Sequence, residues 1–124
     1  MLEGFTKVSM VTGLPSISVT KNGLTFNKPA IVKLGKPTHV NLLQNEEQKK
    51  LAIQVCDERD NDAISFLKDA EKSILSVRWN NSDLLKTISQ WMNWDLDKDG
   101  YRVEGDYYKE ENAMIFDLNQ AKKL

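Results

Sequence analysis

The stretch NGLTFNKPAIVKLG at 22–35 contains residues that favour turns, helix starts and helix ends, and these predict the local secondary structure. Its first two residues, Asn-Gly, form turns readily, and the alternating run SISVT before them is typical of a β-strand. Asn27 can cap a helix in which Pro29 is tolerated in the first turn, and the final glycine can end it. This region therefore predicts a strand with Asn22-Gly23 as a turn or a bulge within it, followed by a short helix of about two turns.

A β-hairpin is expected after this helix. Val40, Leu42 and Leu43 begin a strand, and the polar run NEEQKK at 45–50 is suited to a turn. Leu51, Ile53 and Val55 then alternate with polar or small residues, as in a returning strand with one buried face. The first unit is thus predicted to be a strand, a short helix and a hairpin.

The second part of the chain repeats this order. ILSVRWNN at 74–81 resembles a strand, and Asn81 or Ser82 can cap a helix. That helix carries an apolar stripe at helical spacing, made by Leu84, Leu85, Ile88, Trp91 and Met92. YRVEGDYY at 101–108 and AMIFDL at 113–118 complete another hairpin. Between the units, ISFLKDAEKS at 64–73 has a weakly helical spacing of apolar residues.

Two such units predict an α+β fold with an internal duplication. Ser18 and Ser76 occupy equivalent places, which gives a period of 58 residues, too long for a solenoid. Each unit alone is too small to bury both faces of its hairpin. We therefore expect one domain over 1–124, in which a unit at 16–56 and a unit at 74–119, joined by an acidic connector at 57–73, interlock as a pseudo-dimer within one chain.

Composition and charge narrow the class of protein. The chain is 40% hydrophobic and lacks an apolar run long enough to span a bilayer, so we expect a soluble domain. Its start lacks the pattern of a secretory signal, and Cys56 is the only cysteine, which favours a cytoplasmic protein without an internal disulfide. Net charge is −1 overall, but the first unit alone carries +4, which makes the first unit basic and the remainder acidic.

The first unit resembles the AbrB-type swapped-hairpin family. Gly23 in the strand region, Pro29 near the helix start, and Leu34-Gly35 at the helix end occupy the places that family members commonly fill with such residues. The resemblance covers 16–56 in sequence pattern and 74–119 in topology. It implies a barrel of interwoven hairpins, as in DNA-binding regulators of bacteria and archaea and in MazE-type antitoxins.

This resemblance implies a non-catalytic DNA-binding transcription regulator or an antitoxin-like protein. Lys21, Lys28, Lys33 and Lys36 are the residues expected to contact phosphates of double-stranded DNA. Lysine is a point charge without the planar fork of arginine, so the contacts are expected to be mainly to the DNA backbone. No cofactor is expected.

The alternative is a protein-interaction module that has kept the fold without DNA binding. Such a module would bind a protein partner through the acidic second unit or through tryptophans, with Trp79 and Trp94 as the candidates for exposure. Trp91 lies on the apolar stripe of the second helix and is expected in the core.

The acidic stretch DLDKDGYRVEGD at 95–106 has the spacing of an EF-hand calcium loop. Asp95, Asp97, Asp99 and Asp106 would be its ligands, and a glycine stands where that loop turns sharply. Arg102, however, occupies the position where an apolar residue normally pairs with a second hand. Aspartate and glycine are also common in ordinary turns, so a solvated acidic turn is the preferred interpretation and a calcium loop the minor one.

No enzymatic motif is present in the sequence. It contains no glycine-rich phosphate loop, no zinc-ligand spacing and no hydrolase triad signature, and His39, the single histidine, is expected to be structural or exposed. Cys56 is expected to be a small buried hydrophobe, and a nucleophilic Cys56–His39 pair is the less favoured reading. We therefore expect a protein without catalytic activity.

Overall fold

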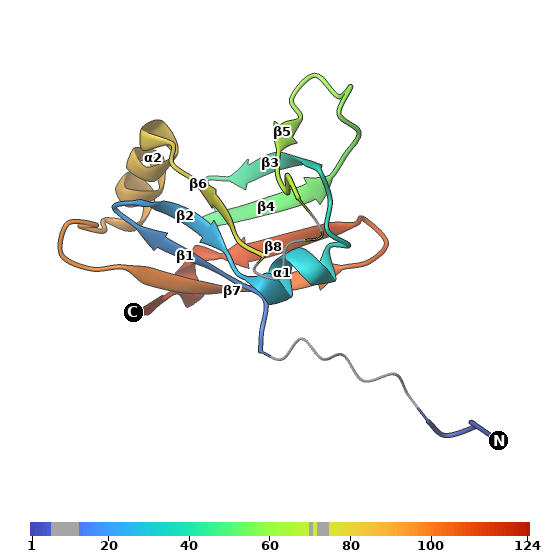
Figure 1. The fold of residues 1–124 in the computed structure, drawn as a ribbon. Helices are drawn as coiled ribbons and strands as arrows, with labels where there is room; N and C mark the ends of the chain where they lie inside the picture. Colours follow the sequence, from blue (N-terminus) through green and yellow to red (C-terminus); the bar gives the residue numbers. More distant parts are fainter. Residues whose placement is uncertain (6–12, 70, 72–74) are drawn as a thin grey trace.

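The strands of the computed structural model form one antiparallel sheet that curls into a half-barrel (Figure 1). The structure describes residues 1–5, 13–69, 71 and 75–124. In chain order the elements are β1 (Ser16–Thr20), β2 (Gly23–Phe26), α1 (Lys28–Lys33), β3 (His39–Asn45), β4 (Lys50–Val55), β5 (Ile64–Ser65), β6 (Val77–Trp79), α2 (Ser82–Met92), β7 (Tyr101–Tyr108), β8 (Ala113–Asp117), the 3-10 helix η1 (Leu118–Gln120) and β9 (Lys122–Lys123). The α+β class is confirmed.

The first short helix begins and ends as the sequence predicts. Asn27 caps α1, because its Oδ1 accepts hydrogen bonds from the backbone N–H groups of Ala30 and Ser16, each at 3.0 Å. Its Nδ2 donates to the carbonyl oxygen of Leu14 and to the hydroxyl of Ser16, both at 2.9 Å. The helix ends at Lys33 with Leu34 as its C-cap, and the next residue, Gly35, has a φ of +86°, in the left-handed region that glycine adopts easily.

The second helix is also confirmed. Asn81 caps α2 by accepting a hydrogen bond from the N–H of Leu84 at 3.0 Å. Leu85 and Ile88 are buried under the helix, as the apolar stripe predicts. Trp91 is only partly buried and packs against the edge of the core, so its expected place in the core is correct only in part.

The weak helix expected over residues 64–73 is wrong for the residues of this segment that the structure describes. Ile64 and Ser65 form β5, which pairs with β3, and the chain then stays beside β3 because the N–H of Phe66 donates to the carbonyl oxygen of Thr38 at 2.7 Å. Phe66 and its neighbour Leu67 are both buried, which an exposed helix would not achieve. Residues 70, 72 and 73 of this segment lie outside the described residues.

The strand expected over 74–81 is shorter in the structure. β6 contains only Val77–Trp79, and residue 74 lies outside the described part of the chain. The acidic connector at 57–73 also contributes β5 to the sheet, so part of it belongs to the folded body.

Strands from the two parts of the chain lie next to each other throughout the sheet. Its order is β5-β3-β4-β8-β7-β1-β2-β6, with β9 added to β7. Four strand pairs therefore join a strand of residues 16–56 to a later one: β3 with β5, β4 with β8, β1 with β7, and β2 with β6. This pairing places residues that are far apart in sequence on common surfaces.

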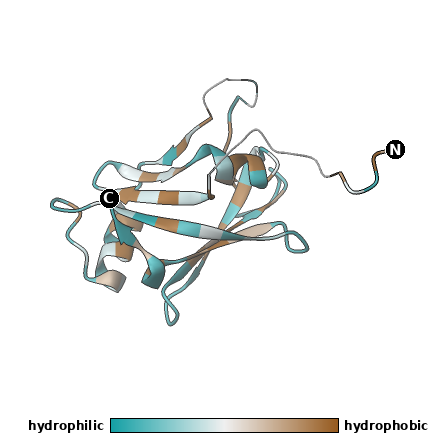
Figure 2. Cartoon of the chain, turned by 90° about the horizontal axis from the view of Figure 1, so that it is seen from below, coloured by the Kyte–Doolittle hydropathy of each residue, from teal (hydrophilic) through white to brown (hydrophobic). Residues whose placement is uncertain are grey.

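One hydrophobic core fills the curl of the sheet. Phe26 lies at its centre and makes edge-to-face contacts with Phe66, Trp79 and Phe116, with ring centroids 5.0, 4.9 and 6.0 Å away. Seen from below, hydrophobic and hydrophilic residues alternate along the strands (Figure 2). The inner face of the sheet is therefore apolar, and polar side chains line most of its outer face.

Candidate nucleic-acid interface

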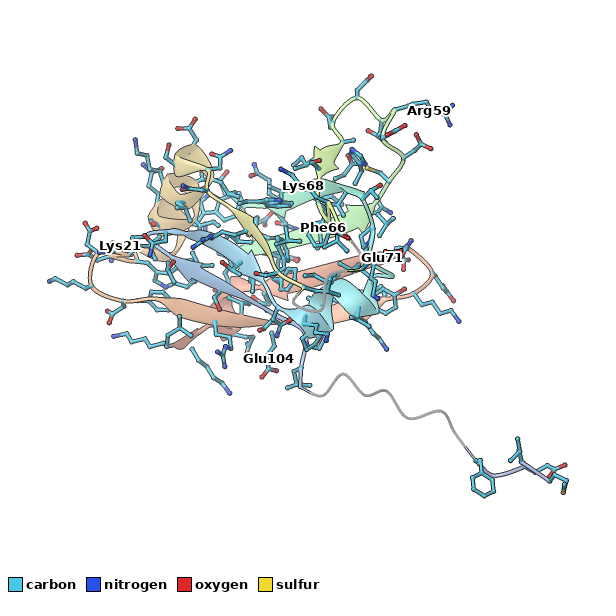
Figure 3. The ribbon with its side chains drawn as sticks, in the orientation of Figure 1. Lys21, Arg59, Phe66, Lys68, Glu71 and Glu104 are labelled. Atoms are coloured by element: carbon cyan, nitrogen blue, oxygen red, sulfur yellow. The ribbon has the colours of Figure 1, made fainter. Side chains whose placement is uncertain are left out.

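The structure gathers three of the four expected phosphate-contacting lysines around α1. Lys28 and Lys33 lie on the helix, and Lys36 follows it with a φ of 55°. Lys21 lies in the turn between β1 and β2, at the end of this hairpin remote from α1 (Figures 1 and 3). All four side chains are exposed. The structure therefore divides the expected set into a cluster of three and one separate residue.

The α1 lysine cluster, Lys28, Lys33 and Lys36, lies in a part of the chain without acidic residues. Residues 13–45 contain no aspartate or glutamate. Within the described residues, the ion pairs are Met1–Glu3, Arg59–Asp57 and Lys123–Asp99, so the cluster takes part in none of them. The Nζ of Lys33 lies 5.5 Å from the centroid of the Tyr107 ring, a cation–π contact that holds one of these charges in place.

Lys21 instead contributes to an open groove beside α2. The groove has a volume of about 530 Å³, and Lys21 and Lys86 line it together with Asp95 and Asp97. Cations and carboxylates are mixed there, so the groove offers no uniform potential to a phosphate.

A second group of cations lies on the outer face of the sheet in a single cross-strand row. The strand register aligns Arg78 on β6, Thr25 on β2, Ser18 on β1, Arg102 on β7 and Lys122 on β9. Residues directly opposite one another in antiparallel strands point to the same side of the sheet. Their chain neighbours Val77, Phe26, Ile17 and Val103 are buried on the inner side, so this cationic row faces solvent.

Small residues lie beside the cationic row. Gly23 has a φ of +141°, and a Cβ at this position would lie 2.8 Å from the carbonyl oxygen of Trp79 and 3.0 Å from Cγ of Arg78. The absence of a side chain at Gly23 therefore leaves room for the stem of Arg78. Thr20, the partner of Gly23 across the strands, is also small.

Carboxylates lie near both arginines of the row, and Asp69 lines an open pocket together with Arg78. Glu104 is exposed on β7, two residues beyond Arg102, and thus on the same side of the strand. Figure 3 shows it below β7, away from the body of the molecule.

Sequence reasoning missed the cationic row because its members come from five strands. Arg78 and Arg102 were assigned to an acidic unit, and their neighbours in space, Ser18 and Thr25, to a basic one. Apolar and polar residues alternate along each strand, and this pattern does predict that the residues of the row lie on the polar faces of their strands. Only the register between strands brings them into one line.

The four carboxylates of the calcium-loop reading are not brought together. Asp95 Oδ1 accepts a hydrogen bond from the N–H of Asp97 at 3.1 Å, and Asp99 forms an ion pair with Lys123 at 3.6 Å. Asp106 lies within β7, about 17 Å along the strand from its first residue at about 3.3 Å per residue. Among the described residues, no group of three or more His, Cys, Asp or Glu side chains is arranged to hold a metal ion.

Cys56 differs from its expected environment. It is partly exposed, not buried, because β4 ends at Val55 and the chain then leaves the sheet. Its N–H donates to the carbonyl oxygen of His39 at 3.2 Å, so the two residues are backbone neighbours. Desolvation, followed by the charges of Asp60 and Asp57, raises the pKa of the thiol. A raised pKa keeps the sulfur protonated at neutral pH, which is unfavourable for a nucleophile.

None of the three tryptophans is exposed enough to be a main contact for a protein partner. Trp79, Trp91 and Trp94 are all partly buried and pack against the core, and Trp94 stacks on Tyr101 with ring centroids 3.9 Å apart. Exposed apolar side chains occur elsewhere, at Leu43 and Tyr108.

Neither helix in the described part of the chain is long and apolar enough to cross a membrane. No family model, curated protein or solved structure matches this chain.

Proposed function

We propose that this protein is a non-catalytic regulator that binds double-stranded DNA through phosphate contacts. One observation carries the proposal: the acid-free segment 13–45 folds so that Lys28, Lys33 and Lys36 are exposed around one short helix. Three exposed cations that form no ion pair with another described residue attract a polyanion, and lysine contacts phosphate without reading a base. Binding by such contacts is sequence-tolerant and weakens steeply with salt.

We also propose that the fold is a swapped-hairpin barrel of the AbrB type, formed within one chain. The pairing of strands supports this. β1 pairs with β7, the first strand of the later hairpin, and β5 pairs with β3, the first strand of the earlier hairpin. The two hairpins meet where β4 pairs with β8. In this assignment β5 is the counterpart of β1, so the second unit begins at residue 64 and not at 74.

The test of the function is a fluorescence anisotropy titration of labelled mixed-sequence duplex DNA at low and at physiological salt. We expect binding that weakens steeply with salt and that is largely lost in Lys28→Glu/Lys33→Glu. The matched control is Arg59→Glu/Lys86→Glu, which makes the same change in net charge at sites remote from α1. Equal loss in both double variants would show a general charge effect and contradict a site at α1. Absence of binding by the unmodified protein at low salt would contradict the function.

A second candidate function is supported by an apolar strip on the outer face of the hairpins. Leu43 and Tyr108 are 46% and 47% exposed, and Leu43, Ala52 and Ile115 are aligned across β3, β4 and β8. Exposed apolar patches mark protein-binding surfaces. Charge reversal at Lys28 and Lys33 separates the two functions, since it should abolish DNA binding and leave capture of a protein partner intact.

A further inference from the structure

We propose that the cationic row, Arg78–Thr25–Ser18–Arg102–Lys122, is a second phosphate-contacting surface for a nucleic-acid duplex. The inference rests on the proposed function and deepens it, because it assigns part of the DNA contact to a face formed mainly by the later strands. The basic residues of the row come from the part of the chain that is acidic overall.

The length of the row matches the scale of a duplex groove. Neighbouring strands are about 4.8 Å apart, so Arg78 on β6 and Arg102 on β7 are separated by three strand spacings, about 14 Å. The major groove of B-DNA is about 12 Å wide. Arginine side chains at the two ends of this interval can therefore reach phosphates on opposite sides of one groove, and Lys122 extends the row by one more strand.

The side chains of the row have the chemistry of a phosphate site. Arg78, Arg102 and Lys122 are exposed and take part in none of the ion pairs formed by the described residues. Arginine binds a phosphate through two parallel N–H donors. Between the cations, the hydroxyls of Ser18 and Thr25 are additional donors of the kind that contact DNA backbones.

Neighbouring residues position the cation at one end of the row. Gly23 and Thr20 form the next cross-strand pair beyond Thr25 and Ser18, and the stem of Arg78 lies over Gly23, because a Cβ there would be 3.0 Å from Cγ of Arg78. The surface next to Gly100 is covered by Leu124, whose Cδ1 would lie 2.9 Å from a Cβ at Gly100. On the other side, Glu104 is a like charge to phosphate and weakens the potential beside Arg102.

The test measures the salt dependence of duplex binding by anisotropy for Arg78→Gln/Arg102→Gln. Loss of two phosphate contacts should weaken binding at least about tenfold at low salt and reduce the slope of log affinity against log salt by about 2. The matched control, Arg59→Gln/Lys86→Gln, removes the same charge elsewhere and should leave the slope unchanged. Circular dichroism and urea unfolding establish that each variant is folded.

The variant Glu104→Gln gives an independent test of duplex binding, because it changes the charge beside the row without removing a cation. It should strengthen duplex binding by several-fold at low salt, because it removes the carboxylate that lies nearest along β7 to Arg102. This arm remains informative if the arginine variant does not fold.

The outcomes separate this inference from the proposed function. If duplex binding is lost in Lys28→Glu/Lys33→Glu but unchanged in the Arg78/Arg102 and Glu104 variants, the row is not a contact surface and the function stands. If the unmodified protein binds no duplex at low salt, both are overturned. A reduced slope in the arginine variant, together with tighter binding by Glu104→Gln, supports the row.

Discussion

The side chain of Asn27 shows how much of this fold depends on single residues. It caps α1 and also ties that helix to the start of β1, through four hydrogen bonds to Ala30, Ser16 and Leu14. An asparagine before a lysine and a proline is a helix-start signal that can be recognised in sequence. Its bonds to Ser16 and Leu14 could not be recognised, because they join residues 11 and 13 positions away.

Asn27→Ala should therefore destabilise the protein more than loss of an ordinary cap. A cap contributes about 1 kcal/mol, and the bonds to Ser16 and Leu14 add a comparable amount, so we expect a loss of about 2 kcal/mol in the free energy of unfolding. Urea unfolding followed by circular dichroism measures this. The control is Asn81→Ala, which removes the cap of α2 and its single bond to Leu84 and should cost about 1 kcal/mol. Equal losses in the two variants would contradict a tying role for Asn27.

Among the elements, α2 follows its sequence most closely. It has a cap, an apolar stripe and a left-handed end at Asn93, all of which are local features. The segment at 64–67 illustrates the opposite case. Its spacing of apolar residues is weakly helical, but pairing with β3 and burial of Phe66 decide its conformation. Tertiary contacts determine the conformation of such short segments, because helix formation in a few residues is intrinsically unfavourable.

The stripe of α2 contributes to stability through burial. Ile88 is fully buried, so Ile88→Ala should lower the free energy of unfolding by about 2–5 kcal/mol, from lost apolar contact and the resulting cavity. Chemical denaturation measures the loss. Gln90→Ala, on the exposed side of the same helix, should change stability by no more than about 0.5 kcal/mol. A loss below 1 kcal/mol at Ile88 would show that α2 is not packed as described.

At the scale of the whole molecule, the two parts of the chain depend on each other for pairing and for the core. β1 and β4 each have a sheet neighbour in the later part, and Phe26 packs against Phe66 and Phe116. Burial of the shared core requires both parts, since neither contains a complete sheet.

Fragments 1–59 and 60–124 should therefore be unfolded when separate and should fold when mixed in equal amounts. Proton–nitrogen NMR spectra measure this as the appearance of dispersed amide signals on mixing. The intact chain is the reference for the native spectrum. A dispersed spectrum from fragment 1–59 alone would show that the first unit folds independently and would contradict interlocking.

The sequence by itself determined most of the elements: both helix caps, the turn near 45–50, and the apolar and polar faces of the hairpin strands follow from residue type and local periodicity, whereas the strand at 64–65 does not. Tertiary structure alone decided which strands are neighbours and in which register. This pairing of strands aligns Arg78 and Arg102 with residues on β1 and β2 of the basic unit. It also places Lys21 apart from the α1 lysine cluster. The physical reason is that strand pairing is a long-range contact: backbone hydrogen bonds are the same for every residue, so register is set by the fit of the whole apolar face.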